Sequence, residues 1–205
     1  MTTLYFHSGA CSMGPHIVLA WIGAPYQAKS VEFGAPDLLA VNAQGAVPVL
    51  AEDDGWTLTQ AGAIVHYLAR KHPEAGLGGE ASARGQAELD RWSSFLTGDL
   101  HPSFFPVFLP QRYTTSRDEA AISATRAAGK KLVEKRLAFM DQQIAGKTYI
   151  LGERSVIDAY AFPMVRWATA LLENGIAPYP NVQAWFDLMH ADKAVQRVLA
   201  VEGLK

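Results

Sequence analysis

Cys11 is the residue of this 205-residue chain with the clearest chemical potential, because it is the only cysteine. It lies with Ser12 between a short apolar run, Leu4 to Phe6, and an expected helix that contains Ile17. Unpaired N–H groups and the positive end of a helix dipole stabilise an anion at a helix start. The position therefore predicts a lowered pKa and ready thiolate formation at Cys11. The alternative is that Cys11 is only a small, buried apolar residue of the core. Its place at a helix start favours the reactive thiol over this alternative.

A lone thiol limits the redox chemistry that is possible. Gly14 stands where a Cys-x-x-Cys motif would have its second cysteine, so a mixed disulfide on Cys11 has no internal thiol to resolve it. The redox interpretation then needs an external thiol, for which glutathione is the small-molecule candidate. A single cysteine also fits a reducing compartment, and we expect a cytoplasmic protein.

Two further residues stand where chemistry is possible. Pro48 interrupts the apolar run Val47 to Leu50; because proline cannot donate to a sheet ladder, it is expected at an edge or in an unusual local geometry. Such an edge can pair with an extended peptide. His101, just before Pro102, is a candidate base, hydrogen-bond donor or plain surface residue, and it can meet Cys11 only if the fold brings them together.

Other motifs favour structural roles. Ser155 and Asp158 have the spacing of a capping box, so Asp158 is expected to cap a helix rather than act as a catalytic acid. The stretch from Phe104 to Pro110 is either core or one wall of an apolar pocket. The six histidines share no metal-ligand spacing, and we find no phosphate loop or nucleophile elbow.

The elements that must position these residues change in kind along the chain. Up to residue 75 the pattern predicts the order β-α-β-α-β-β-α. Its strands are expected at Leu4–Phe6, Val31–Phe33, Val47–Leu50 and, after an Asp-Asp-Gly turn, Trp56–Leu58; its helices at residues around Ile17, at Leu38–Val41 and at Gln60–Lys71. A segment rich in glycine and proline, 73–81, then marks a linker. From residue 82 to 205 the apolar spacing is helical throughout, which predicts an all-α bundle.

Composition excludes several classes of protein. Hydrophobic residues make up 49% and charged residues 19%, which is typical of a chain with a packed core rather than a disordered one. The net charge of −2 is unlike that of a nucleic-acid binder. The sequence contains no apolar run long enough for a membrane span, and its first residues lack the pattern of a secretory signal.

Taken together, these segments resemble the cytosolic glutathione transferases, and among them the bacterial beta class. The resemblance is carried by Leu4 through Ser12 with Pro15-His16-Ile17, by Asn42 to Leu50, by Leu58 to Leu68, by Leu100-His101 with Phe105 to Phe108, and by Ser155 to Tyr160. It covers nearly the whole chain. It implies a thioredoxin-like α/β domain (1–75) followed by an all-helical domain (82–205), in a homodimer.

The resemblance also implies a glutathione site between the domains. Cys11 matches a cysteine that serves as hydrogen-bond donor, nucleophile or redox thiol, with Ser12 as a second donor, and His101 matches a histidine offered by the helical domain. Val47, before a cis-Pro48, matches the residue whose backbone pairs with the tripeptide. Gln60 and Ala61 match the γ-glutamyl site, where the family usually has an acidic residue and then Ser or Gly.

The function implied is transfer of glutathione to a hydrophobic electrophile, or thiol–disulfide exchange through Cys11. Two alternatives remain open at this stage. One is a non-catalytic interaction module on the same fold. Gln60 and Ala61 support this alternative, because they differ from the residues that the family usually has at these positions. The other is a glutathione-dependent dehalogenase or isomerase.

Overall fold

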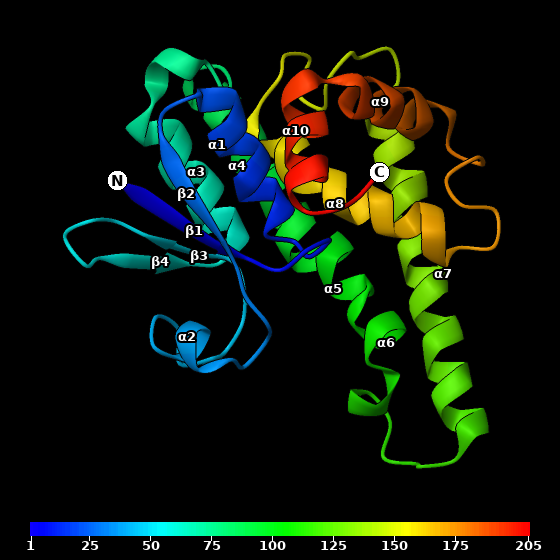
Figure 1. The fold of residues 1–205 in the computed structure, drawn as a ribbon. Helices are drawn as coiled ribbons and strands as arrows, with labels where there is room; N and C mark the ends of the chain where they lie inside the picture. The colour runs from blue at the N-terminus through cyan, green and yellow to red at the C-terminus, as the bar shows by residue number, and fades with distance from the viewer.

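The computed structural model describes residues 1–205, which begin with a four-stranded sheet (Figure 1). The strand order is β2-β1-β3-β4, with β1 parallel to β2 and the other pairs antiparallel. The strands are β1 (Thr2–Phe6), β2 (Tyr26–Ser30), β3 (Val49–Ala51) and β4 (Thr57–Thr59), and the helices of this part are α1 (Met13–Ile22), α2 (Pro36–Leu39) and α3 (Ala61–Lys71). Strand side chains alternate between faces, so Leu4 and Leu50 join the main core with α1 and α3, whereas Val49 packs with Leu38 of α2.

Everything after the sheet is helical. The helices are α4 (Ala83–Phe95), α5 (His101–Ser103), α6 (Phe105–Phe108), α7 (Glu119–Gln143), α8 (Val156–Leu171), α9 (Pro180–Ala191) and α10 (Lys193–Val201), with short turns η1 (Pro73–Ala75), η2 (Leu96–Leu100) and η3 (Pro110–Arg112). The predicted fold class, a thioredoxin-like part followed by a helical part, is confirmed. The exact boundaries 1–75 and 82–205 stay a prediction, since one continuous core contains buried residues of both parts.

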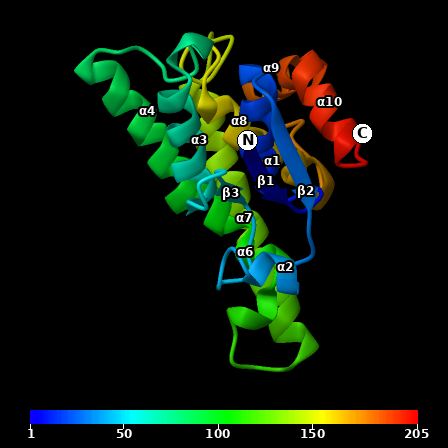
Figure 2. The same cartoon turned by 60° about the vertical axis from the view of Figure 1, so that its left-hand side comes forward.

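Helix α1 joins the two parts. Figures 1 and 2 both place it between α3 and α10, and it also packs on α8. Gly14 makes the α8 contact possible, because a Cβ there would lie 3.0 Å from the Cα of Tyr160. The start of α1, which follows Cys11, thereby packs against the N-terminal part of α8.

One expectation from the sequence is wrong at the sheet, and another is decided between its two alternatives. The second strand is Tyr26–Ser30, not Val31–Phe33. It is an edge strand paired only with β1, and its sequence, YQAKS, lacks the apolar run that marks a buried strand. Pro48 does not lie at a sheet edge, since it precedes β3, which has neighbours on both sides. It has the unusual local geometry that was the other expectation: its bond to Val47 is cis, as the resemblance implies.

The capping box at the start of α8 is confirmed. The Ser155 hydroxyl accepts from the N–H of Ile157, and the Asp158 carboxylate accepts from the Ser155 N–H at 2.9 Å. Asp158 is fully buried and also accepts from the Ile150 N–H at 2.9 Å and the Trp185 indole N–H at 2.8 Å. This carboxylate therefore fixes where α8 begins and, through it, the side chains that α8 presents to α1. No helix in the structure has the length and apolar character that crossing a membrane requires.

Candidate active site between the sheet and the helices

The loop before α1 is closed by Ser12. Its side chain is fully buried, and its hydroxyl donates to the carbonyl of His7 at 3.3 Å and accepts from the His7 N–H at 3.2 Å. Because the hydroxyl points into the fold, the expectation that Ser12 is a second donor to glutathione is wrong. Ser12 instead shapes the turn that presents Cys11.

Gly9, in the same loop, is held by the helical part. Its N–H donates to Glu202 Oε2 at 2.9 Å, and its carbonyl accepts from the indole N–H of Trp167 at 2.7 Å. The other oxygen of Glu202 lies 2.9 Å from His16 Nδ1, and both side chains are buried. Leaving a buried hydrogen-bonding group without its partner is costly, so Glu202 holds the loop that carries Cys11 in place.

Cys11 itself is a protonated thiol. It is half-buried, with Sγ 3.7 Å from the carbonyl of Val47. Burial raises the pKa of the Cys11 thiol to about 12, against which the N–H groups of Cys11 and Ser12 act in the lowering direction with smaller effect. The predicted lowering of this pKa is therefore wrong. The N–H groups at the helix start do act to lower the pKa, as expected, but desolvation of the thiolate raises it by more.

The helical wall is built around His101. A π-helical turn, η2, leads into this residue, and such turns are frequent at functional sites. Its Nδ1 lies 3.1 Å from the hydroxyl of Tyr160, and its ring packs against Trp167 and Phe105 with centroids 5.4 and 5.0 Å away. Burial lowers the pKa of His101 to about 4, so the imidazole is neutral at physiological pH.

Tyr160 lies between the two walls of the site, the one formed by the Cys11 loop and the helical one around His101. It is 3% exposed. Burial raises the pKa of its hydroxyl, and the negative charge that Cys11 gains on deprotonation is close enough to raise it further. Tyr160 therefore lies near Cys11 while it bonds His101. His7, before the Cys11 loop, directs Nδ1 to the Val31 carbonyl at 3.0 Å and packs on Phe33.

Tyr160 and Trp167 were not predicted as site residues. They stand seven residues apart in α8, which places both on one face of the helix. Two large aromatic residues with polar tips on a single face were the available signal. The aromatic stretch after His101 was expected to be either core or a pocket wall, and it is partly each. Phe104 is core, whereas Phe105 and Phe108 are partly exposed. The Phe108 ring packs edge-on against Trp167, with centroids 5.2 Å apart.

Main-chain groups near Cys11 are free to bind a peptide. The N–H of Val47 makes no hydrogen bond, and its carbonyl accepts only from the Cys11 thiol, at 3.7 Å, which leaves it a second lone pair. Gln60, the N-cap of α3, has φ 71° and an exposed side chain without a hydrogen bond. Ala61 opens α3, where the first-turn N–H groups have no partner within the helix. These features suit an extended ligand with a carboxylate at one end.

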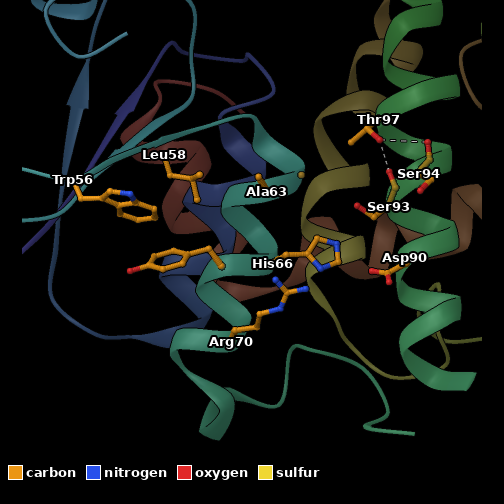
Figure 3. Close-up of a pocket in the computed structure, with 11 residues that line it drawn as sticks. Trp56, Leu58, Ala63, His66, Arg70, Asp90, Ser93, Ser94 and Thr97 are labelled. Atoms are coloured by element: carbon orange, nitrogen blue, oxygen red, sulfur yellow. Dashed lines mark hydrogen bonds between the residues drawn. The ribbon is translucent and has the colours of Figure 1, made fainter. Parts of the chain in front are cut away.

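A separate groove lies between α3 and α4. It has a volume of about 600 Å³, with Leu58 of β4 and the preceding Trp56 at one end (Figure 3). Its lining contains neither Cys11 nor His101. In Figure 3, His66 and Arg70 of α3 point across it toward Asp90 of α4. No group of three or more histidine, cysteine, aspartate and glutamate residues is placed to hold a metal ion.

Known proteins match this chain over nearly its full length. Residues 1–70 match the family model of the glutathione S-transferase N-terminal domain, and residues 123–188 match that of the C-terminal domain. Glutathione S-transferase GST-4.5 of Xanthomonas campestris is 36% identical, with 98% of each chain covered. A glutathione S-transferase structure from Xylella fastidiosa has a TM-score of 0.92 at 32% identity and 100% coverage of both chains. A sphingomonad glutathione S-transferase solved with glutathione has a TM-score of 0.85 at 32% identity, covering 99% of this chain and 100% of that one.

Proposed function

Because this chain belongs to the glutathione S-transferase family, we propose that it conjugates glutathione to a hydrophobic electrophile between Cys11 and His101. The observation that carries the proposal is the pair of neutral donors, a protonated Cys11 thiol and a neutral His101 whose Nδ1 contacts the Tyr160 hydroxyl. Neutral donors stabilise a thiolate without taking on charge themselves.

The free main-chain groups supply the binding half of the proposal. The backbone of glutathione pairs with the N–H and carbonyl of Val47 before cis-Pro48, as an added strand does. The γ-glutamyl carboxylate takes the free N–H groups at the start of α3, beginning with Ala61. The amide oxygen of Gln60 accepts from the γ-glutamyl ammonium, a weaker bond than a carboxylate would make.

The chemical step then follows from the donors. The glutathione thiol gives its proton to solvent, and the Cys11 S–H and the His101 N–H donate hydrogen bonds to the resulting thiolate. The sulfur electron pair forms a bond to the electrophilic carbon, and the leaving group departs with the electrons of the bond that breaks. Cys11 stays a thiol throughout, so conjugation is favoured over thiol–disulfide exchange through this residue.

Conjugation to chlorodinitrobenzene by Cys11 variants tests the proposal. Cys11→Ala removes the donor and is expected to lower kcat by about tenfold or more, whereas Cys11→Ser keeps a donor and retains most of the rate. A Cys11→Ala enzyme as active as the wild type contradicts the donor role. A glutathione adduct on Cys11 by mass spectrometry would favour the exchange chemistry instead, and no turnover with no binding at millimolar glutathione would favour an interaction module.

We further propose that the α3–α4 groove is the interface of a homodimer. Trp56 at its end is 44% exposed and packs on Tyr67 with centroids 5.0 Å apart. Arg70 and Asp90 line the same groove with opposite charges, so a two-fold arrangement can bring Arg70 of each copy to Asp90 of the other.

Sedimentation equilibrium tests the dimer. We expect a mass of twice the chain's 22.3 kDa, a shift to the monomer for Trp56→Asp, and no shift for Tyr113→Asp, a matched change at an exposed aromatic outside the groove. A wild-type mass of one chain contradicts the interface. We also place the protein in the cytoplasm, where reduced glutathione and a lone free thiol coexist; fractionation of cells that express it checks this.

A further inference from the structure

The hydroxyl of Tyr160 has one hydrogen-bond partner in the protein. Nδ1 of His101 lies 3.1 Å from it, and no other side chain or backbone group bonds this oxygen. The tyrosine is 3% exposed. A buried O–H that lacks an acceptor is destabilising, so the single contact decides how the proton is arranged.

Two arrangements of the pair are possible. If Nδ1 carries the proton, the imidazole donates to the tyrosine oxygen and the tyrosine O–H is left without an acceptor. If the tyrosine O–H donates to Nδ1, both groups are satisfied and the imidazole proton is on Nε2. Burial keeps both groups neutral, because it raises the pKa of Tyr160 and lowers that of His101 to about 4. The second arrangement is therefore the favoured one.

We propose that Tyr160 is a positioning residue that holds His101 in its Nε2–H tautomer and so presents an N–H donor to the sulfur of glutathione. The catalytic consequence of this inference rests on the proposed function. The assignment of the tautomer does not depend on it. Second partners commonly fix the tautomer of a functional histidine in this way.

The surroundings hold the pair in place. The His101 ring packs against Phe105 and Trp167, and its side chain makes its one hydrogen-bond contact with Tyr160. The backbone of Tyr160 is fixed from two sides: Gly14 of α1 approaches it closely, and the Asp158 cap stands two residues before it. The tyrosine hydroxyl can therefore determine the orientation of the imidazole rather than adapt to it.

Nitrogen NMR of the histidine rings in the protein without glutathione tests the tautomer directly. Wild type is expected to show His101 as a single Nε2–H form. Tyr160→Phe keeps the ring and removes the hydroxyl, and is expected to give a mixture of tautomers. Tyr149→Phe is the matched control: this half-buried tyrosine lies outside the site and its hydroxyl has no partner, so His101 should be unchanged. An Nδ1–H form in wild type, or an unchanged tautomer in Tyr160→Phe, would overturn the inference.

Steady-state kinetics then separate positioning from stability. For Tyr160→Phe we expect kcat to fall about tenfold while KM for glutathione changes less than about twofold, at a temperature where the variant stays folded. Tyr149→Phe should keep both constants. A changed tautomer with unchanged kcat would contradict the positioning role. If wild type itself shows no conjugation, the proposed function fails, and the NMR result still decides the tautomer.

Discussion

The two walls of the candidate site are held by different means. Cys11, Val47 and Gln60 are shaped by local backbone conformation: a turn closed by Ser12, a cis peptide and a positive φ at the start of α3. The helical part also holds the Cys11 loop, through hydrogen bonds to Gly9. The helical wall depends on contacts between distant side chains, since His101 and Tyr160 are 59 residues apart and Gly9 and Trp167 are 158 apart. Local conformation leaves marks in the sequence, whereas distant contacts do not.

Burial nevertheless acts on both walls toward the same end. It raises the pKa of Cys11 and lowers that of His101, so each wall presents a neutral hydrogen-bond donor. The two walls therefore differ in how they are held in place and not in their chemistry. Substitutions that loosen one wall at a time can show what each wall contributes.

Asp158→Ala should have the largest effect, because it releases α8 and with it the helical wall. The carboxylate accepts from three backbone or hydroxyl groups and from Trp185 in a fully buried position. We expect the free energy of unfolding to fall by about 4 kcal/mol, measured by chemical denaturation. Asp118→Ala is the control, since Asp118 caps α7 without a side-chain bond to the helix and should cost less than about 1 kcal/mol. Equal losses for the two variants would contradict this role for Asp158.

The pH dependence of stability should report the burial of His101. Its folded pKa, about 4, is below the ordinary 6.5, so the unfolded chain binds more protons between these values and stability falls as the pH drops from 6.5 to 4. Comparison with His101→Gln, which lacks this titration, should isolate a difference of up to about 3 kcal/mol over that window. Parallel curves for the two proteins would mean that His101 titrates normally.

Trp167→Phe should loosen the contact between the walls. The variant loses the indole N–H that donates to the carbonyl of Gly9, and we expect a loss of about 1–2 kcal/mol in the free energy of unfolding. Trp56→Phe is the control, because the Trp56 indole N–H has no partner in the chain and its ring is 44% exposed. Losses of the same size would show that the Gly9 bond contributes little.

Much of the fold could be predicted from the sequence, for reasons that specific residues illustrate. Helical spacing located α3 and α8, and the Asp-Asp-Gly turn located the β3–β4 hairpin. The edge strand β2 was missed because only its pairing with β1 defines it. Its residues have no apolar run to mark it.

The site could be predicted only in part. The place of Cys11 followed from the loop before α1, but its pKa did not, because desolvation depends on how α1 packs against α8 and no local pattern reports that. Tyr160 and Trp167 escaped notice because their partners lie far away in the chain. Sequence thus predicted the wall made by backbone conformation better than the wall made by side-chain contacts.

The smallest expected effect is on the backbone-built wall. Gln60→Glu gives the γ-glutamyl ammonium a charged acceptor, and we expect about 1 kcal/mol, or roughly fivefold, tighter glutathione binding. Gln142→Glu adds the same charge on exposed α7 and should leave affinity unchanged. Equal affinities for Gln60→Glu and wild type would show that Gln60 does not face the ligand.

Calorimetric titration of the wild-type protein with reduced glutathione at neutral pH tests the central claim most directly, that the two walls together form a glutathione site. The account predicts a saturable heat with one tripeptide bound per chain, and a weaker but measurable affinity in Cys11→Ala, which keeps the free main-chain groups of Val47. The absence of any saturable heat at millimolar glutathione, in a protein shown to be folded, would contradict it.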